Sequence, residues 1–487
     1  MTEARNYFFI AIFAALIGTG CYSMRSSSGA GQTKFSPPRK PNPADVALPS
    51  GYRIEVVAQN LTFPTGITFD NDGEIYVVES GYSYGEMWTT PRLLRITSGG
   101  KTETVASGVN NGPWNGITFP KGNFFVAEGG VLEGGKILRI TPEGKITALI
   151  SNLPSFGDHH TDGPAVGPDG QIYFGQGTAS NSGVIGEDNH NFGWLKRNPK
   201  FHDIPGEDIT LSGQNFETKN VLTGKGRAKT GAFLPFGTPS YAGQVIKGQV
   251  PCSGGVMKIS PDGGQPELIA WGFRNPYGLT FSPDGKLFVS CNGYDDRGSR
   301  PVWGNSDLLW QVNQGTWYGW PDFTGDEPLS EKDYQPPGKP ALKFLIANHP
   351  DRPPKPVARL GVHAAAGGLD FSRNANFGHK GEVFVALFGD QAPTVGKVLA
   401  PVGIRIVRVN VATGVIEDFA VNKGKRNGPA SKIGGGGLER PLAVRFSPDG
   451  AALYVVDFGV ATQDKNGTKP KSGTGVIWRI VREGGSK

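Results

Sequence analysis

Cysteine is scarce in this chain, and the cysteines that are present form no metal or haem motif. The 487 residues include only three, Cys21, Cys252 and Cys291. None of them belongs to a CxxC or CxxCH motif, which excludes a zinc ribbon and a c-type haem attachment site. Cys252 and Cys291 either pair as a disulfide in an oxidising compartment or remain two buried free thiols, and the sequence leaves both open.

The chain also lacks long blocks of like charge and a long apolar segment. Its net charge is +6 and its pI is near 9.0, but Lys and Arg are scattered. This distribution predicts solubility and no nucleic-acid-binding surface. The one locally basic tract, residues 422–426, is expected to be a solvated loop. The N-terminal apolar run, residues 7–18, has about a dozen residues and is too short to span a bilayer comfortably.

The N-terminus instead matches an export signal. The apolar run has the length of a signal-peptide core, so residues 1–21 are expected to be a signal peptide. The run ends in GTGC, which is similar to a bacterial lipoprotein signal with Cys21 as the lipidated residue. Lipid anchoring, simple cleavage and a retained anchor stay open. The protein is therefore expected to be exported, as a periplasmic protein or a membrane-anchored lipoprotein, with residues 22–47 as a Ser/Gly/Pro-rich tether.

Glycine and proline, in contrast, are abundant. The chain holds 73 Gly and 38 Pro, spread among many aromatic residues, which predicts short strands joined by tight turns. From residue 51 onward a strand–turn–strand pattern returns six times, and in most copies two further strands follow it. The six copies begin at Phe63, Gly112, His159, Arg274, Gly367 and Glu439.

Six such units predict an all-β fold. We expect a six-bladed β-propeller of four-stranded antiparallel blades over residues 48–487. The sixth unit lacks its last strand, whereas a lone strand at residues 51–61 precedes the first unit. The N-terminal strand is therefore expected to complete the last blade and close the ring. Two insertions, residues 178–251 and 321–362, are expected on one rim.

Polar residues recur where the blade pattern predicts that rim, because the start of the first strand and the end of the second meet on one face. They are Trp114, Asn115, His159, His160, Arg274, Asn275, His363 and Arg440 before the first strands, and Glu79, Glu128, Gln176, Asn292, Asp390 and Asp457 after the second. Such a ring of His, Arg and carboxylate groups predicts a polar small-molecule site. Glu79, Glu128 and Asp457 have a second interpretation as anchors between blades.

Three stretches resemble the soluble quinoprotein glucose/sorbosone dehydrogenase family. They are GFRNPYGLTFSPDG with NQGTWYGWPDF, starting at residues 272 and 313, LPSFGDHHTDGPAVGPDGQIYFGQG from residue 153, and ERPLAVRFSPDGAALYVVDFG from residue 439. The resemblance covers residues 48–481. It implies a six-bladed propeller, the cofactors pyrroloquinoline quinone (PQQ) and Ca²⁺, and oxidation of aldoses, sorbosone-like sugars or related polyols and aldehydes. The implied partners are a sugar-like substrate and an electron acceptor.

The resemblance also implies roles for individual residues. His159 would be the general base, oriented by Asp158, and would take the hydroxyl proton while hydride leaves for the quinone. Arg274 and Asn275 would bind the reactive quinone carbonyl, and Arg274 would stabilise the charge that develops there.

Further positions would hold the cofactor and the metal. Arg440 would bind cofactor carboxylates, and Gln176 and Asn292 are further expected cofactor contacts. The expected calcium ligands are main-chain carbonyls of Gly293 and Tyr294 and the acid-rich tract that follows them, Asp295 and Asp296.

The chain departs from the family pattern at two cation positions. Leu442 stands where a second late arginine is expected, and Phe388 and Gly389 stand where a lysine is expected. Fewer cations weaken the binding of a tricarboxylate. Lys397 and Arg405 are candidates to replace them.

Two other functions stay open at this point. One is a calcium-dependent lactonase or hydrolase on the same propeller, with Glu79, Asn115 and Asp457 as metal ligands. The other is a non-enzymatic propeller that binds a glycan or a protein on its rim. The missing cations favour these two, whereas the histidine and the Arg-Asn pair on adjacent blades favour the dehydrogenase.

Overall fold

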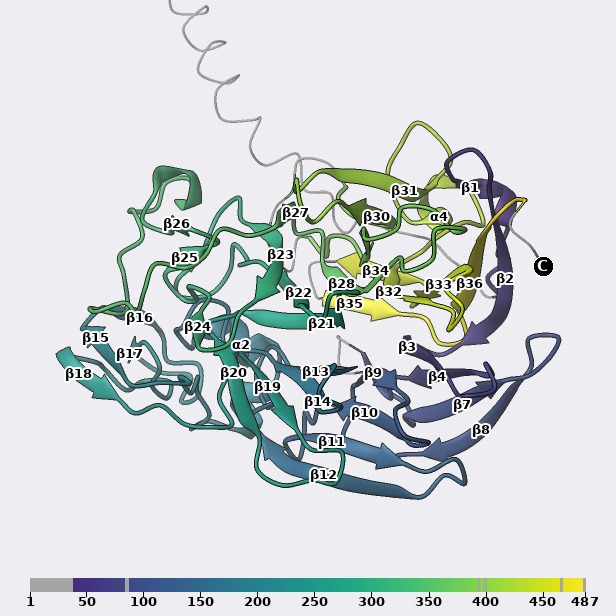
Figure 1. Cartoon of the computed structure of the whole chain (residues 1–487). Helices are drawn as coiled ribbons and strands as arrows, with labels where there is room; N and C mark the ends of the chain where they lie inside the picture. The colour runs from purple at the N-terminus through teal and green to yellow at the C-terminus, as the bar shows by residue number, and fades with distance from the viewer. Residues whose placement is uncertain are drawn as a thin grey trace, which may run out of the picture.

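The fold is a six-bladed β-propeller, as the sequence predicts (Figure 1). The computed structural model describes residues 38–83, 87–392, 395–396, 398, 401–464 and 467–484. The predicted signal peptide and Cys21 lie outside these residues. None of the described helices has the length and apolar character of a membrane span.

Each blade is an antiparallel sheet whose first three strands follow one another in the chain. Blade 1 holds β3 (Pro64–Phe69), β4 (Ile75–Glu79), β7 (Arg92–Ile96) and β8 (Thr102–Ser107), and blade 2 holds β9 (Trp114–Thr118), β10 (Phe124–Glu128), β11 (Gly135–Ile140) and β12 (Ile146–Leu153). Blade 3 holds β13 (Thr161–Val166), β14 (Ile172–Gln176), β19 (Gly255–Ile259) and β20 (Glu267–Trp271), and blade 4 holds β21 (Asn275–Phe281), β22 (Leu287–Asn292), β23 (Ser306–Val312) and β27 (Ala358–Val362). Blade 5 holds β28 (Ala366–Phe371), β29 (Val383–Leu387), β30 (Arg405–Val409) and β31 (Ile416–Asn422), and blade 6 holds β32 (Pro441–Phe446), β33 (Ala452–Asp457), β36 (Gly475–Arg482) and β2 (Tyr52–Leu61).

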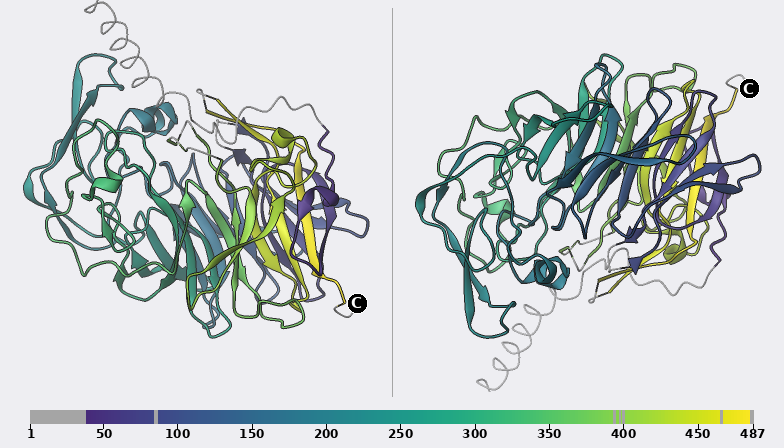
Figure 2. Two further views of the ribbon diagram at one scale, coloured as in Figure 1. Left: turned by 90° about the horizontal axis from the view of Figure 1, so that it is seen from above. Right: turned by 90° about the horizontal axis from the view of Figure 1, so that it is seen from below.

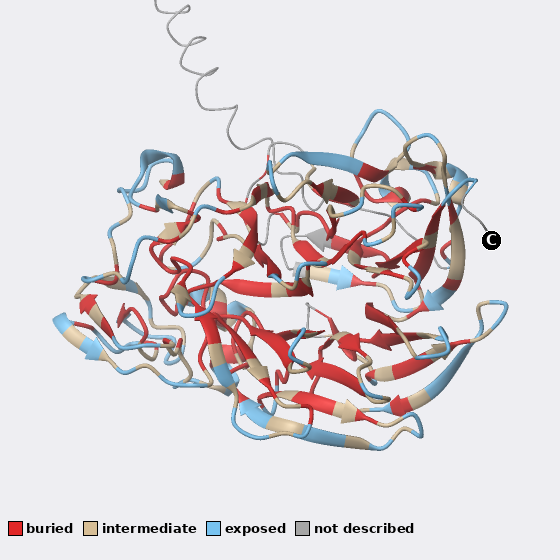
Figure 3. Cartoon of the chain, viewed as in Figure 1, coloured by how far each residue is buried: buried red, intermediate tan, exposed pale blue. Residues whose placement is uncertain are grey.

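The N-terminal strand closes the ring, as predicted. β2 pairs with β36 in an antiparallel register from Tyr52 opposite Arg482 to Leu61 opposite Gly475. The innermost strands of neighbouring blades contact one another around the whole circle, and β32 contacts β3. Burial is high on the innermost and second strands of the blades and falls on the outermost ones (Figure 3).

Glycine lets the inner strands approach. A Cβ atom on Gly66 of β3 would lie 2.6 Å from the Cα of Gly116 in β9, and one on Gly116 would lie 2.0 Å from the carbonyl oxygen of Gly163 in β13. On the other side of the ring, a Cβ atom on Gly367 of β28 would lie 2.1 Å from the carbonyl oxygen of Leu442. No side chain fits at these distances, so the ring closes only around glycine.

The segment before β2 packs onto the propeller, although the sequence analysis placed residues up to 47 in a tether. Arg39 is buried, with its Nη2 2.6 Å from Oδ2 of Asp457 in blade 6. Strand β1 (Val46–Ala47), which follows the short helix η1 (Pro43–Asp45), pairs with β31 of blade 5. Residues 38–47 therefore belong structurally to the propeller. The polar composition of residues 38–47 does not reveal this packing, because the side chain that is buried is Arg39, which pairs with Asp457.

Two insertions lie beside blades 3 and 4, as predicted. The first joins β14 to β19 and holds α2 (Glu187–Asn191), α3 (Trp194–Arg197), β15 (Ile209–Ser212), β16 (Asn215–Lys219), β17 (Arg227–Gly231) and β18 (Ala242–Ile246). The second joins β23 to β27 and holds β24 (Thr316–Trp317), β25 (Phe323–Thr324), β26 (Glu327–Pro328) and η2 (Lys332–Tyr334). The remaining short elements are β5 (Tyr82–Ser83), β6 (Met87–Trp88), α4 (Ala430–Ile433), β34 (Ala461–Asp464) and β35 (Gly467–Pro470).

The insertions pack against each other at one side of the disc (Figure 2). The amide of Ser212 donates to the carbonyl of Leu345 at 2.9 Å, and the ion pair of Arg300 with Asp322, also at 2.9 Å, is fully buried. The predicted second insertion, 321–362, ends too late, because residues 358–362 form the outer strand of blade 4.

The two described cysteines, Cys252 and Cys291, are both free and buried. Burial raises their thiol pKa values to about 12 and about 11. Of the two possibilities that the sequence left open, the structure has the pair of free thiols.

The glycine contacts yield a stability prediction. Gly116 and Gly122 both have a positive φ, of 80° and 76°, but only Gly116 has neighbours where a Cβ atom would lie. We expect Gly116→Ala to lower the free energy of unfolding by about 3 kcal/mol or more, through both overpacking and strain. Gly122→Ala should cost only about 1–2 kcal/mol, through strain. Chemical denaturation measures both, and equal losses would contradict the close-approach argument.

Candidate functional site

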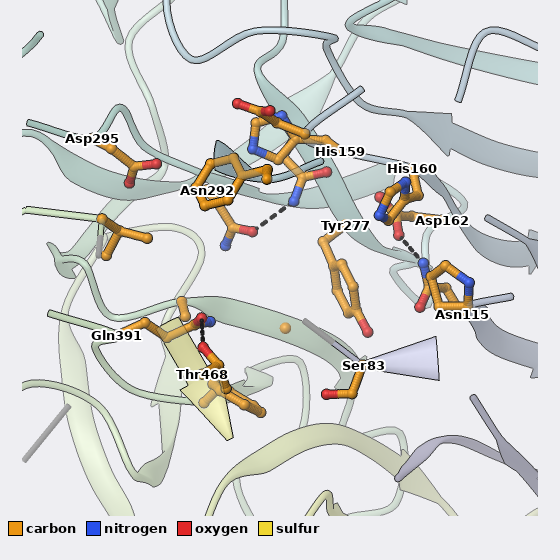
Figure 4. Close-up of a pocket in the computed structure, with 18 of the residues that line it drawn as sticks. Ser83, Asn115, His159, His160, Asp162, Tyr277, Asn292, Asp295, Gln391 and Thr468 are labelled. Atoms are coloured by element: carbon orange, nitrogen blue, oxygen red, sulfur yellow. Dashed lines mark hydrogen bonds between the residues drawn. The ribbon is translucent and has the colours of Figure 1, made fainter. Parts of the chain in front are cut away.

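One cavity of about 570 Å³ opens where the loops of all six blades meet (Figure 4). This volume is in the range of small-molecule sites. Of the predicted site residues, Asp158, His159, Arg274, Asn275, Asn292, Gly293 and Asp295 line it. The blade geometry therefore brings the histidine and the Arg-Asn pair to one cavity, as predicted. Residues of α2 and α3 also line it, so the first insertion forms part of its wall.

His159 precedes β13 and is held by the chain that follows β14. Its Nδ1 lies 3.0 Å from the carbonyl oxygen and 3.2 Å from the hydroxyl oxygen of Thr178. A carbonyl only accepts hydrogen bonds, so Nδ1 carries the proton and Nε2 of the neutral ring is left with its lone pair. His159 is thus set up to accept a proton.

The electrostatics of the site keep His159 neutral. Burial, and then the nearby guanidinium groups of Arg274 and Arg297, lower the pKa of His159 well below its usual value. A cationic ring would be desolvated and repelled by both arginines. The imidazole therefore stays available as a base throughout the neutral pH range.

Asp158 does not orient His159, contrary to the role that the resemblance implies. Its Oδ1 accepts from Asn189 Nδ2 at 2.9 Å and from Trp194 Nε1 at 2.7 Å, and its Oδ2 pairs with Arg297 at 2.7 Å. The orienting partner of His159 is Thr178. Asp158 is thus bound to the helices of the first insertion, whereas the ring of His159 is bound to the chain that follows β14.

Arg297 links three carboxylates above the cavity. Its guanidinium contacts Asp158, Asp188 at 2.5 Å and Asp295 at 2.9 Å, and it lies over the ring of Phe192 at 4.7 Å. Burial raises the pKa of Asp188 to about 6 despite this cation. The network fixes α2 and α3 to the propeller, since Asp188 belongs to α2 and Trp194 to α3.

Arg274 and Asn275 occupy neighbouring positions before and in β21. Arg274 Nη2 pairs with Asp295 Oδ2 at 2.6 Å and donates to Asn181 Oδ1 at 3.0 Å. Asn275 Nδ2 donates to Asn292 Oδ1 at 2.8 Å (Figure 4). Asn275 Oδ1 is buried and has no hydrogen-bond partner among the described residues. The site thus holds a polar atom next to His159 that is available to accept a hydrogen bond from a water molecule or a ligand.

The predicted calcium ligands are engaged with other groups. Burial acts to raise the pKa of Asp295, but Arg274 and Arg297 outweigh it and hold that pKa below its ordinary value. The Gly293 amide donates to Asp307, and Tyr294 is buried in the core of the insertions. The Asp296 amide donates to the carbonyl of Val395. Among the described residues, no three His, Cys, Asp or Glu side chains are arranged to hold a metal ion. Ligation through main-chain carbonyls stays a prediction.

Two predicted cofactor contacts lie outside the cavity lining. Gln176 is fully buried and bonds to Thr161 and to the carbonyl of Pro154. Arg440 is also fully buried and donates to the carbonyls of Phe388 and Asp390, at 3.2 and 3.0 Å. The register of β32 shifts at Pro441–Ala443, which turns Leu442 toward the cavity and Arg440 away from it.

The wall on blades 5 and 6 is mainly apolar. Ala365, Phe388, Leu442 and Phe458 form its apolar part, and Gln391 and Thr468 add uncharged polar groups. None of the described residues that line the cavity from these two blades is Lys or Arg. Arg405 pairs with Asp418 on the outer strands and does not replace the missing cations. Lys397, the other candidate, lies outside the described residues.

The acidic residues at the ends of the second strands anchor blades. Glu79 accepts from the Thr62 amide and pairs with Arg92. Glu128 and Asp457 each accept from a tryptophan Nε1, of Trp114 at 3.1 Å and Trp478 at 3.2 Å. None of the three lines the cavity. The ligand set of the lactonase hypothesis, which needs Glu79 and Asp457 beside Asn115, is therefore not assembled.

Sequence reasoning missed Thr178, Arg297 and Asp162. Thr178 acts through its carbonyl, which no residue pattern reveals. Arg297 lies in the acid-rich tract that was interpreted as a metal site, and its position directly after two acids is typical of an ion-pair network. Asp162 follows the two histidines within β13, and an acidic residue on an innermost strand was the available signal.

Comparison with known proteins supports the resemblance to the quinoprotein sugar dehydrogenases. No family model matches the chain. Over 205 residues, 41% of the chain, it is 25% identical to quinoprotein glucose dehydrogenase B of Acinetobacter calcoaceticus, and the match spans only 34% of that protein's length.

Solved structures with the same fold cover most of the chain. The PQQ-bound aldose sugar dehydrogenase of Streptomyces coelicolor matches with a TM-score of 0.50 and 17% identity over 89% of this chain and 99% of its own. The PQQ domain of pyranose dehydrogenase from Coprinopsis cinerea matches with a TM-score of 0.54 and 16% identity over 93% and 100%. At these identities the structures establish the propeller fold alone.

The arginine network yields a second prediction. Arg297→Gln leaves three buried carboxylates without their shared cation, so we expect a loss of about 3–5 kcal/mol in unfolding free energy. Arg227→Gln, in the first insertion, removes a solvent-exposed pair with Glu217 and should cost less than about 1 kcal/mol. Urea denaturation compares the two, and hydrogen exchange should show faster opening of α2 and α3 in Arg297→Gln alone. Similar stability of the two variants would contradict the anchoring role.

Proposed function

We propose that this chain is an exported, PQQ- and calcium-dependent dehydrogenase that oxidises an aldose, a sorbosone-like sugar or a related sugar alcohol or aldehyde. The curated relative is a quinoprotein glucose dehydrogenase, and the structures with the same fold include a PQQ-bound aldose sugar dehydrogenase. The observation that carries the proposal is His159, a neutral base beside Arg274 and Asn275 in the cavity. Export rests on the N-terminal signal alone.

The residues on the blade 3 and 4 side fit the reactive end of a quinone. Arg274 supplies a guanidinium and Asn275 supplies amide N–H groups, one of which donates to Asn292, at the rim position that faces His159. A quinone carbonyl accepts from such donors, whereas the unpartnered Asn275 Oδ1 would accept from a hydroxyl group. These groups and Asn292 would hold the carbonyl end of PQQ. The chemistry that the cofactor supplies when bound is acceptance of a hydride from the carbon that bears the substrate hydroxyl.

The other side of the cavity fits a planar ring better than a carboxylate. Phe388, Leu442 and Phe458 offer apolar contact, and the described cations that line the cavity, Arg197, Arg274 and Arg297, all come from the blade 3 and 4 side. We therefore expect cofactor carboxylates to depend on those arginines, and cofactor affinity to be lower than a full set of cations gives.

The proton is handled by His159. Nε2 accepts the proton of the substrate hydroxyl, and Nδ1–H stays bonded to the carbonyl of Thr178, which stabilises the imidazolium that forms. Asp295 neutralises Arg274 and so limits the repulsion between that guanidinium and the protonated ring. An external electron acceptor would take up the two electrons that leave the substrate.

Of the alternatives, no described feature favours the lactonase, because its metal ligands are not assembled. A non-enzymatic propeller does not require a neutral histidine next to an unsatisfied amide in a deep cavity. The dehydrogenase accounts for both.

Replacement of His159 tests the proposal. His159→Asn keeps a donor for the Thr178 carbonyl but removes Nε2, so we expect dye reduction with PQQ, Ca²⁺ and an aldose to fall by at least about 100-fold in kcat. His202→Asn is a matched control, because Nδ1 of His202 also contacts a main-chain carbonyl, that of Lys200, outside the cavity. Equal activity of wild type and His159→Asn, or no PQQ binding by wild type at micromolar concentrations, would contradict the proposal.

The pH profile gives a further test. Because the pKa of His159 is lowered well below its usual value, the base stays unprotonated as pH falls. We expect kcat to hold constant from pH 8 down to about pH 6 and to fall only below that. Stopped-flow measurement of the reductive half-reaction gives the acid side of this pH profile without a contribution from the dye. A fall in rate centred at or above pH 6.5 would show that the site does not suppress protonation of His159.

A further inference from the structure

We propose that Asp162 and Asn115 form a second polar subsite of the cavity, which binds one hydroxyl group of an uncharged polyol or sugar away from the oxidised carbon. That the ligand is a sugar rests on the proposed function. The subsite itself follows from the contacts of the two side chains, which come from neighbouring blades and lie apart from the His159 group.

The two residues lock each other in place. Asn115 of β9 donates from Nδ2 to Asp162 Oδ1 at 2.7 Å and to the carbonyl of Thr161 at 3.3 Å. Both side chains line the cavity, and their residues are only 7% and 2% exposed. Asp162 Oδ2 is buried and has no hydrogen-bond partner among the described residues.

Asp162 is unusual among the acids of the cavity. Asp158, Asp188 and Asp295 all pair with arginine, and Asp307 accepts from the main-chain amides of Gly293 and Ala366. Asp162 has neither an arginine nor a main-chain amide to stabilise its charge. Burial raises the pKa of Asp162 well above its usual value, and only the hydrogen bond from Asn115 opposes this. An isolated buried carboxylate is costly, so the group is a carboxylic acid with its proton on the unpartnered oxygen.

The pair then presents one donor and one acceptor. Both protons of Asn115 Nδ2 are used within the protein, which leaves Oδ1 as an acceptor, and the acid hydroxyl of Asp162 is a donor. A ligand hydroxyl both accepts and donates one hydrogen bond, so it satisfies both groups. A carboxylate ligand would accept hydrogen bonds but could donate none. Satisfying a buried donor recovers on the order of 1–3 kcal/mol, which is enough to affect affinity about tenfold or more.

The subsite is separated from the reacting groups. In Figure 4, Asn115, Asp162 and His160 lie on one side of Tyr277, and His159, Asn292 and Asp295 lie on the other. A ligand that reaches both sides must carry hydroxyl groups beyond the one that is oxidised. This geometry selects polyhydroxylated substrates over simple alcohols.

Two variants of Asp162 separate its hydrogen-bonding role from its acidity. Asp162→Ala removes the donor and should raise KM for an aldose about tenfold or more while kcat changes less than about threefold. Asp162→Asn is neutral and keeps a donor, so its KM should stay within about threefold of wild type. Asp370→Asn makes the same change at a buried carboxyl outside the cavity and should leave KM unchanged. An Asp162→Ala variant with unchanged KM would overturn the proposal.

A thermodynamic cycle of binding measurements identifies the sugar hydroxyl that contacts Asp162, without relying on turnover. Glucose and its monodeoxy derivatives are titrated calorimetrically into wild type and Asp162→Ala in the absence of PQQ. We expect one deoxy position to weaken binding about tenfold in wild type and to have no further effect in the variant. If no deoxy position behaves in this way, the proposed subsite is wrong. If the cycle holds but the reconstituted protein does not oxidise sugars, the subsite stands and the proposed dehydrogenase function fails.

The protonation of Asp162 is directly observable. Infrared spectra of wild type at neutral pH should contain a carboxylic-acid C=O band that Asp162→Asn loses and Asp370→Asn keeps. If Asp162→Asn retains the whole band, Asp162 is ionised and the donor role is wrong.

Discussion

The inner strands of the six blades approach so closely that backbone meets backbone, and the rest of the structure depends on this contact. Gly66 meets Gly116, Gly116 meets Gly163, and Gly367 meets Leu442, at distances that leave no room for a Cβ atom. Because the ring closes this tightly, loops that are more than a hundred residues apart in sequence reach one cavity. His159 and Arg274 act on the same small volume only because β13 and β21 are neighbours in this ring.

The cavity divides its charges unequally around that ring. On blades 3 and 4, arginines and aspartates neutralise one another in a network that also holds the insertion helices. The two arginines that this network positions suppress protonation of His159. On blades 5 and 6 the wall is mainly aromatic and aliphatic, with the uncharged Gln391 and Thr468 beside it, and on blades 2 and 3 an acid without a cation pairs with an amide. Charged, apolar and neutral polar surfaces thus face one ligand from three directions.

The sequence predicted the fold well because strand pairs separated by Gly turns repeat six times, and it predicted which rim residues gather. It did not predict where their side chains point. Each innermost strand has a register irregularity near its start, as at Pro441–Ala443 in β32, and a shift of one residue exchanges the two faces of a strand. That shift buries Arg440 and exposes Leu442 to the cavity. The partner of His159 escaped prediction for another reason, since a main-chain carbonyl supplies it.

The pairing of β2 with β36 has a consequence for how the protein is made. β2 ends at Leu61 and its partner begins at Gly475, so a chain emerging from the ribosome carries an unpaired ten-residue strand while residues 62–474 are synthesised. The buried ion pair between Arg39 and Asp457 likewise forms only after Asp457 has been synthesised. The last blade therefore assembles only after translation is nearly complete. An exposed strand edge of that length invites pairing with other chains, so a holding chaperone would aid the yield of closed propeller.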